Sequence, residues 1–248
     1  LKHEYIVALH EDGQNIIIGT NEGLSLYNRS LNIITPYPFI NEGKTIRDEV
    51  FEIIVKKDGI LWLGSESSGL YRYELETGKV KHFLPPNEHV TIENPRFNKV
   101  VNVEILDASR ILVVFTYNAL ILNYEMEIIS EILETEEVIT SIKSSENTFL
   151  LGSGMGSLHK LAIEEFSIII TKEKDVSPGF GIRSLERNLD NELWIGTENN
   201  GLHIYDENLE FVSHIEYSVK RPNSISGNSI WSLLCARNGT MWIAPYKS

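Results

Sequence analysis

The chain has 248 residues, of which 42% are hydrophobic and 23% charged, and this composition excludes a mainly disordered protein. Its 35 acidic and 22 basic residues give a formal net charge of −13, so we expect no nucleic-acid partner for this segment, because phosphate binding favours a basic surface. No apolar stretch reaches the ~20 residues that span a bilayer, and the single cysteine, Cys235, excludes a disulfide framework within the chain.

One motif recurs along the chain: an apolar run ends at a glycine, and a Gly-Leu pair and a tyrosine follow. The copies, three of them strong, are Ile16–Tyr27, Leu61–Tyr73, Ile111–Tyr124, Phe149–Leu158, Leu193–Tyr205 and Met241–Ala244. We place the repeat anchors at the glycine or its equivalent, near Gly19, Gly64, Phe115, Gly152, Gly196 and Ala244. These positions are about 45 residues apart on average, which indicates a repeat protein.

A second apolar element precedes the motif at a steady distance. It reads Val50–Ile53 before Trp62, Ile182–Leu185 before Trp194 and Ile230–Leu233 before Trp242. A polar turn such as Lys57-Asp58-Gly59 separates the two elements. Alternating apolar residues around an Asp-Gly turn predict a β-hairpin, and two further strands follow each hairpin.

Four short antiparallel strands in about 45 residues predict one blade of a β-propeller. We therefore expect an all-β fold over residues 1–248, with about five blades and part of a sixth. The run from Trp242 to Tyr246 resembles an anchor interrupted before its Gly-Leu turn, which favours an incomplete arc of a larger propeller. The alternative is a closed ring of five or six blades. Trp62, Trp194 and Trp242 are expected to wedge between neighbouring sheets, where the glycines permit close approach.

The repeat resembles the regulator-propeller repeat of two-component systems. The resemblance rests on a Leu-Trp-Ile-Gly-Thr-x-x-x-Gly-Leu-x-x-Tyr core and a Ser-Ile-x-Trp-Ser-Leu hairpin, seen in Leu61–Tyr73, Leu193–Tyr205 and Ser229–Ile243, with a typical linker at Arg221–Asn228. It implies the periplasmic sensor of a Bacteroidetes hybrid two-component system. It also implies a much longer parent with two seven-bladed propellers, a membrane helix and a histidine kinase, all outside this segment.

Motifs for catalysis or metal binding are weak or missing in the sequence. The glycines of Gly152–Gly156 are spaced wrongly for a dinucleotide loop and align instead with the repeat turn at Gly64–Gly69. The seven histidines show no helical zinc spacing, and no Gly-x-Ser-x-Gly elbow occurs. We therefore predict no catalytic residue, no metal and no cofactor for this segment.

Propellers commonly bind ligands through loops at one face of the ring. The loops that enter the first strand of each blade carry arginine, asparagine and aromatic residues, and the candidate ligand-binding residues are Arg47, Arg96, Phe97, Phe180, Arg183, Asn228 and Trp231. Aromatic rings stack on sugar rings, and Arg and Asn donate hydrogen bonds to hydroxyl or acidic groups. The arginines would suit an acidic or sulfated oligosaccharide. A second interpretation stays open, in which Arg183 and Trp231 only line the channel between blades.

These observations lead to one main functional hypothesis and two alternatives. The main one is a non-enzymatic, periplasmic propeller segment that senses an oligosaccharide or other small ligand. Its parent would act as a homodimer and reach the membrane only through a helix outside this segment. The alternatives are a scaffold that binds proteins at the propeller rim and a propeller enzyme of the lyase or quinoprotein type.

Overall fold

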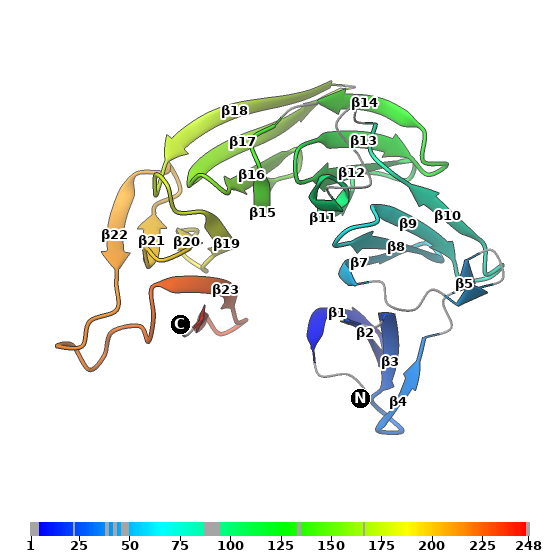
Figure 1. Ribbon diagram of the computed structural model, residues 1–248, viewed down its shortest axis with the longest axis horizontal. Helices are drawn as coiled ribbons and strands as arrows, with labels where there is room; N and C mark the ends of the chain where they lie inside the picture. The colour runs from blue at the N-terminus through cyan, green and yellow to red at the C-terminus, as the bar shows by residue number, and fades with distance from the viewer. Residues whose placement is uncertain are drawn as a thin grey trace. The chain divides into compact units, whose positions relative to one another are not determined.

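Short antiparallel strands joined by tight turns make up most of the chain in the computed structural model (Figure 1). The structure describes residues 5–21, 23–37, 40–41, 44–45, 50–86, 95–132, 135–165 and 167–246. The strands fall into two units, Leu1–Thr135 and Glu136–Ser248, and each is described by itself. Within the described residues, no helix is long and apolar enough to cross a membrane.

Unit 1 contains three four-stranded sheets, named blades 1 to 3, whose strands pair antiparallel in chain order. Blade 1 comprises β1 (Ile6–Asp12), β2 (Asn15–Thr20), β3 (Gly23–Asn28) and β4 (Ile33–Pro36). Blade 2 comprises β7 (Phe51–Lys57), β8 (Ile60–Ser65), β9 (Leu70–Glu74) and β10 (Val80–Phe83). Blade 3 comprises β11 (Val100–Ile105), β12 (Arg110–Phe115), β13 (Ala119–Asn123) and β14 (Ile128–Ile132). A small hairpin, β5 (Ile40–Asn41) and β6 (Lys44–Thr45), and a 3-10 turn, η1 (Pro95–Asn98), lie in the connections.

Unit 2 contains two more blades of the same order and a two-stranded sheet, the final hairpin. Blade 4 comprises β15 (Val138–Ser145), β16 (Thr148–Ser153), β17 (Ser157–Glu164) and β18 (Ser167–Asp175). Blade 5 comprises β19 (Ile182–Arg187), β20 (Leu193–Thr197), β21 (Leu202–Tyr205) and β22 (Phe211–Ile215). The final hairpin comprises β23 (Ser229–Cys235) and β24 (Met241–Tyr246). The described residues thus contain five four-stranded blades and the first two strands of a repeat, which confirms the predicted all-β blade architecture.

The second and third strands of a blade are its most buried elements. Every residue of β8 is buried, whereas every residue of β4, a fourth strand, is exposed. A strand that is covered on both faces has a nearly continuous apolar sequence, whereas a strand at the outer edge can contain polar residues. This difference explains why the anchor motif stands out in the sequence and the fourth strands do not.

Neighbouring blades within a unit pack through the first strand of the second blade. In unit 1, Val100 and Val103 of β11 share one core with Trp62 and Leu70 of blade 2. Trp62 is fully buried, and its ring meets that of Tyr124 edge-on at 5.6 Å. Trp62 therefore wedges between blades 2 and 3, whereas Trp242 of the final hairpin is largely exposed.

The anchor glycines leave room for the first strand of the following blade. A Cβ atom on Gly64 would lie 2.7 Å from Cγ1 of Val100, and one on Gly196 would lie 2.7 Å from Cγ2 of Ile230. Both distances are shorter than carbon–carbon van der Waals contact, so any larger residue would push the two sheets apart.

The strand register corrects the anchor of blade 3 by one residue. In blade 2 the anchor Gly64 pairs with Ile53. The equivalent pair in blade 3 is Val114 with Asn102, so Val114 holds the anchor position. Phe115 lies one position further on, where blade 2 has a serine. The predicted anchor, Phe115, is therefore one residue too far along the chain, because β12 contains no glycine to mark the position.

Candidate functional site

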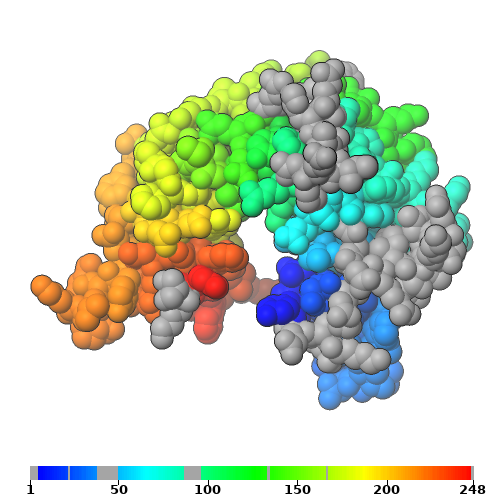
Figure 2. All heavy atoms as spheres, viewed as in Figure 1, coloured from blue at the N-terminus to red at the C-terminus, as the bar shows by residue number. Residues whose placement is uncertain are grey.

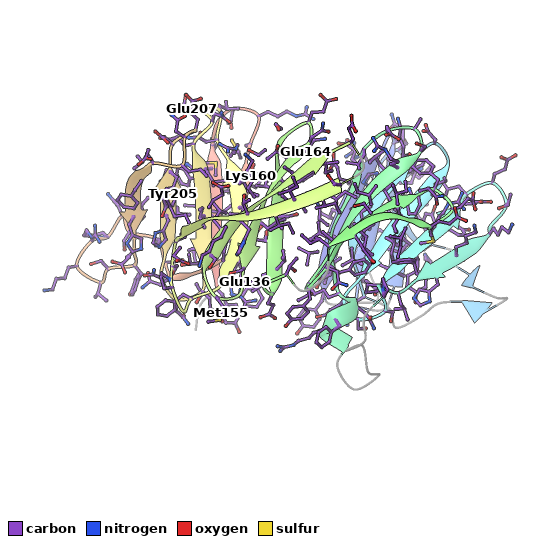
Figure 3. All side chains as sticks on the ribbon, turned by 90° about the horizontal axis from the view of Figure 1, so that it is seen from above. Glu136, Met155, Lys160, Glu164, Tyr205 and Glu207 are labelled. Carbon is purple, nitrogen blue, oxygen red and sulfur yellow. The ribbon has the colours of Figure 1, made fainter. Side chains whose placement is uncertain are left out.

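The loops that enter the first strands, which were expected to bind ligand, lie at the same end of the strands within unit 2 as the turns that follow the anchor glycines. Figure 3 shows Glu136, just before the first strand of blade 4, and Met155, in the turn after its anchor glycine, at one end. Glu164 and Glu207 lie at the opposite end. A backbone hydrogen bond joins the two kinds of loop in blade 5. The amide of Glu198, in the turn after the anchor glycine, donates to the carbonyl of Gly181, just before the first strand, at 2.8 Å.

Arg183 and Trp231 hold the same position in two successive repeats. Each follows a buried isoleucine at the start of its first strand, Ile182 in β19 and Ile230, the second residue of β23. The guanidinium carbon of Arg183 lies 5.6 Å from the centroid of the Trp231 ring, within the range of a cation–π interaction. The structure thus brings these two predicted residues together.

Glu198 completes an ion pair with Arg183. The Nη2 and Nε groups of Arg183 donate to the same carboxylate oxygen, Oε2 of Glu198, at 2.5 and 3.2 Å. Both side chains remain partly exposed, so the pair is reachable from solvent. Glu198 was not among the predicted residues, although it stands directly after an anchor Gly-Thr pair, as Glu66 stands after Gly64-Ser65.

Tyr246 adds a second ring to the site. It stacks on Trp231 with a centroid distance of 5.1 Å and an interplanar angle of 29°. The exposed fractions are 53% for Trp231 and 58% for Tyr246, so the stack presents a wide aromatic surface to solvent. The sequence prediction missed Tyr246 because its pairing with β23 depends on the strand register.

The other predicted residues of unit 2 have different surroundings. Phe180 is about two-fifths exposed in the loop before β19. The side-chain oxygen of Asn228 accepts a hydrogen bond from the amide of Tyr217 at 2.7 Å, and its carbonyl accepts one from the amide of Gly201 at 2.8 Å. Asn228 therefore holds the loop between β22 and β23 in place next to the site.

The predicted residues of unit 1 form a separate group. Arg96 and Phe97 lie in η1, where Arg96 is exposed and the Phe97 ring lies 4.8 Å from that of Tyr117. Arg47 lies outside the described residues. We call the unit 2 group of Arg183, Glu198, Trp231 and Tyr246 the aromatic site, because it joins two predicted residues with two that the sequence did not indicate.

Two stacked histidines support the turn that carries Glu198. The rings of His203 and His214 lie 4.1 Å apart, and Nε2 of His214 donates to the carbonyl of Asn200 at 2.7 Å. The side-chain amide of Asn200 donates to Nε2 of His203 at 3.3 Å, which requires a neutral imidazole. Burial and the neighbouring His214 lower the pKa of His203 to about 4.

The described residues hold no group of three or more His, Cys, Asp or Glu side chains arranged around a common point for a metal ion. The aromatic site itself offers a flat apolar surface, a guanidinium and a carboxylate. Such a combination can stack against a ring and exchange hydrogen bonds with hydroxyl groups.

Comparisons with known proteins agree with this architecture. Residues 224–247, which include Trp231 and Tyr246, match the family model of the two component regulator propeller. This match confirms the resemblance read from the sequence. None of the curated proteins matches the chain.

Solved structures share the fold at low sequence identity. The chain is similar to the extracellular domain of the system BT4673 from B. thetaiotaomicron in two crystal structures, with a TM-score of 0.72 and identities of 19% and 20%. These matches cover 97% and 96% of this chain and 31% of the other. The extracellular domain of the hybrid two component system BT3049 from the same organism has a TM-score of 0.57 at 17% identity, covering 98% of this chain and 39% of the other. The chain therefore has the β-propeller fold and spans about a third of the length of these domains.

Proposed function

We propose that the chain is a ligand-sensing propeller segment from the extracytoplasmic part of a bacterial hybrid two-component sensor, and that it acts without enzymatic chemistry. The regulator-propeller match at residues 224–247 supports this proposal, and so does the fold shared with the extracellular domains of two hybrid two component systems from B. thetaiotaomicron. The signal would be a ligand held by the loops at one end of the blades. A kinase would belong to another part of the same protein.

The ligand of the aromatic site is an oligosaccharide in this proposal. The single observation that carries it is the exposed stack of Trp231 and Tyr246, flanked by the ion pair of Arg183 and Glu198. Sugar rings stack on such aromatic surfaces through their C–H faces, while a guanidinium and a carboxylate bind hydroxyl groups. Because Glu198 balances the charge of Arg183, the site favours a neutral sugar over the acidic or sulfated one that the arginines alone suggested.

Binding would act on the kinase by shifting a conformational equilibrium of a sensor homodimer in the periplasm. A ligand moves such an equilibrium only by the difference between its affinities for the two states. Trp231 and Tyr246 lie on the final hairpin, whereas Arg183 and Glu198 lie on blade 5. The affinity of a ligand that contacts both pairs would therefore depend on how the two neighbouring sheets of unit 2 pack against each other.

Replacing Trp231 by alanine is expected to weaken oligosaccharide binding at least about tenfold, which corresponds to about 1.4 kcal/mol. Titration calorimetry of the chain with a panel of neutral and acidic oligosaccharides would measure the effect. Phe211→Ala serves as the control, because Phe211 is equally exposed but lies on the outer strand β22. Wild-type binding to neutral glycans that Trp231→Ala loses and Phe211→Ala keeps would support the proposal. Equal affinity of all three proteins, or binding of no glycan at all, would contradict it.

A further inference from the structure

The ion pair of the aromatic site has a counterpart at the same repeat positions in blade 4. In blade 5 the pair takes Arg183 from the first strand and Glu198 from the turn after the anchor glycine. In blade 4 the same two positions are held by Ile139 and Gly154. These two residues supply an aliphatic side chain and an open space, but no polar side chain of their own.

A carboxylate from the neighbouring position fills the space beside Gly154. A Cβ atom on Gly154 would lie 2.6 Å from Oε2 of Glu137, which directly precedes β15. The backbone amide of Gly154 also donates to the carbonyl of Glu137 at 2.8 Å, so the two residues stay together whatever the side chain does. Blade 4 therefore places a carboxylate beside the repeat position at which blade 5 carries Glu198.

Gly181 connects this part of blade 4 with the aromatic site. A Cβ atom on Gly181 would lie 3.1 Å from the carbonyl oxygen of Gly154 and 3.4 Å from Cδ1 of Ile139. The carbonyl of Gly181 accepts the hydrogen bond from the amide of Glu198 at 2.8 Å. Figure 2 shows blades 4 and 5, coloured from green to yellow, packed against each other. The backbone of a single residue thus contacts the turns of both blades.

The tips of the same loops carry exposed apolar side chains. Phe180, directly before Gly181, is 42% exposed, and Met155, directly after Gly154, is 64% exposed. The amide of Gly179 donates to the carbonyl of Met155 at 3.1 Å, which joins the two tips. Both loops belong to blades that contain all four strands, so this exposure does not depend on an adjacent sheet.

We propose that the sugar-binding surface continues from the aromatic site onto blade 4, where Glu137 and Phe180 bind a second sugar unit. This inference rests on the proposed oligosaccharide binding and adds to it a minimum ligand length and a selectivity. The carboxylate of Glu137 accepts hydrogen bonds from sugar hydroxyl groups, and the Phe180 ring stacks on the apolar face of the sugar. We call Glu137, Ile139, Gly154 and Phe180 the second subsite.

The charge of Glu137 determines which sugar unit fits the second subsite. In the aromatic site, Arg183 balances the charge of Glu198. Among the described residues, none forms a hydrogen bond or an ion pair with the carboxylate of Glu137, which is partly exposed. An acidic sugar unit would therefore meet an uncompensated like charge, which is unfavourable in a binding site. The second subsite accepts a neutral unit and rejects a uronic acid or a sulfated sugar.

The second subsite is tested by titration calorimetry of the whole chain with single sugars, disaccharides and trisaccharides of β-1,4-linked glucose, mannose, xylose and galactose. The wild type is expected to bind the disaccharide of a recognised sugar at least about tenfold more tightly than the single sugar, because hydrogen bonds to a charged group contribute that much. Glu137→Ala and Phe180→Ala should lose this gain and keep the affinity for the single sugar. Glu164→Ala is the control, because it removes the same charge from an exposed position at the opposite end of blade 4 (Figure 3), and it should keep the gain.

Gly154→Ala tests the position of the carboxylate without changing the net charge. Gly154 does not have a positive φ, so its backbone accepts alanine. The added methyl group would take the place of Oε2 of Glu137 and displace the flexible end of that side chain. We expect Gly154→Ala to lose the disaccharide gain as Glu137→Ala does.

Glu137→Gln tests the selectivity, because glutamine keeps a hydrogen-bond acceptor and removes the charge. The wild type is expected to bind the neutral disaccharide at least about tenfold more tightly than its counterpart oxidised to uronic acids at C6, and Glu137→Gln should reduce this preference to about threefold or less. An unchanged preference in this variant would overturn the selectivity.

The outcomes separate this inference from the proposed function on which it rests. Glycan binding that Trp231→Ala weakens, but that Glu137→Ala and Gly154→Ala leave at wild-type strength, would overturn the second subsite and keep the aromatic site. A wild-type affinity that does not rise from the single sugar to the disaccharide would do the same. Binding of no glycan by the wild type would overturn both.

Discussion

Replacing Trp62 by alanine is expected to lower the free energy of unfolding by about 3–5 kcal/mol, the usual cost of removing a large buried aromatic side chain. Trp62 is fully buried between blades 2 and 3, where it meets Val100, Val103 and the ring of Tyr124. The first strand of blade 3 cannot fill the space left by the indole, because Gly64 already places β8 against Val100. Urea unfolding followed by circular dichroism would measure the loss.

The chain contains its own control for this prediction. Trp242 holds the equivalent repeat position in the final hairpin but is largely exposed, so Trp242→Ala should change the free energy of unfolding by about 0.5 kcal/mol or less at low protein concentration. The comparison separates the role of the tryptophan in packing from its role in the sequence motif. Similar losses for the two variants would show that the repeat position, and not its burial, determines the effect.

Replacing His203 by tyrosine is expected to make the chain more resistant to acid. The pKa of His203 is about 4 in the folded chain because of burial and the nearby His214, compared with about 6.5 in the unfolded chain. As the pH falls from 6.5 to 4, the unfolded chain takes up a proton that the folded chain does not bind. The free energy of unfolding therefore decreases through this window, by up to about 3 kcal/mol.

The repeat itself suggests tyrosine as the substitute. In blade 2 the equivalent residue is Tyr71, whose ring stacks on His82 at 4.4 Å as His203 stacks on His214. Tyr is neutral throughout this window, so His203→Tyr should keep the stacking and remove the titration. Thermal unfolding of both proteins between pH 7 and pH 4 would measure the difference. Parallel losses of stability in the two proteins would contradict this account.

The blade pattern could be predicted from the sequence because it depends on short-range features. Central strands covered on both faces must be apolar throughout, as β8 is, and the turns between strands need residues such as Asp58-Gly59. The anchor glycines follow from the same packing, since Gly64 and Gly196 face the next first strand too closely for a side chain. Where the glycine is replaced, as at Val114, the pattern located the blade but missed its anchor by one residue.

The candidate site was only partly predictable. Arg183 and Trp231 could be proposed because they share one repeat position, and their contact follows from the packing of neighbouring first strands. Glu198 and Tyr246 belong to the turn and the strand that pair with those first strands. No sequence pattern marks either residue. Only the structure shows that Glu198 contacts Arg183 and that Tyr246 stacks on Trp231.

The sequence alone determined the all-β class, the repeat of about 45 residues and the positions where sheets must approach closely, because these depend on apolar periodicity and on side-chain size. The tertiary structure decided which copies of the motif are buried. Trp62 and Trp242 occupy the same place in the repeat, yet one is enclosed by a neighbouring sheet and the other faces solvent. Burial depends on the surface that an adjacent blade supplies, and a local pattern carries no information about that surface.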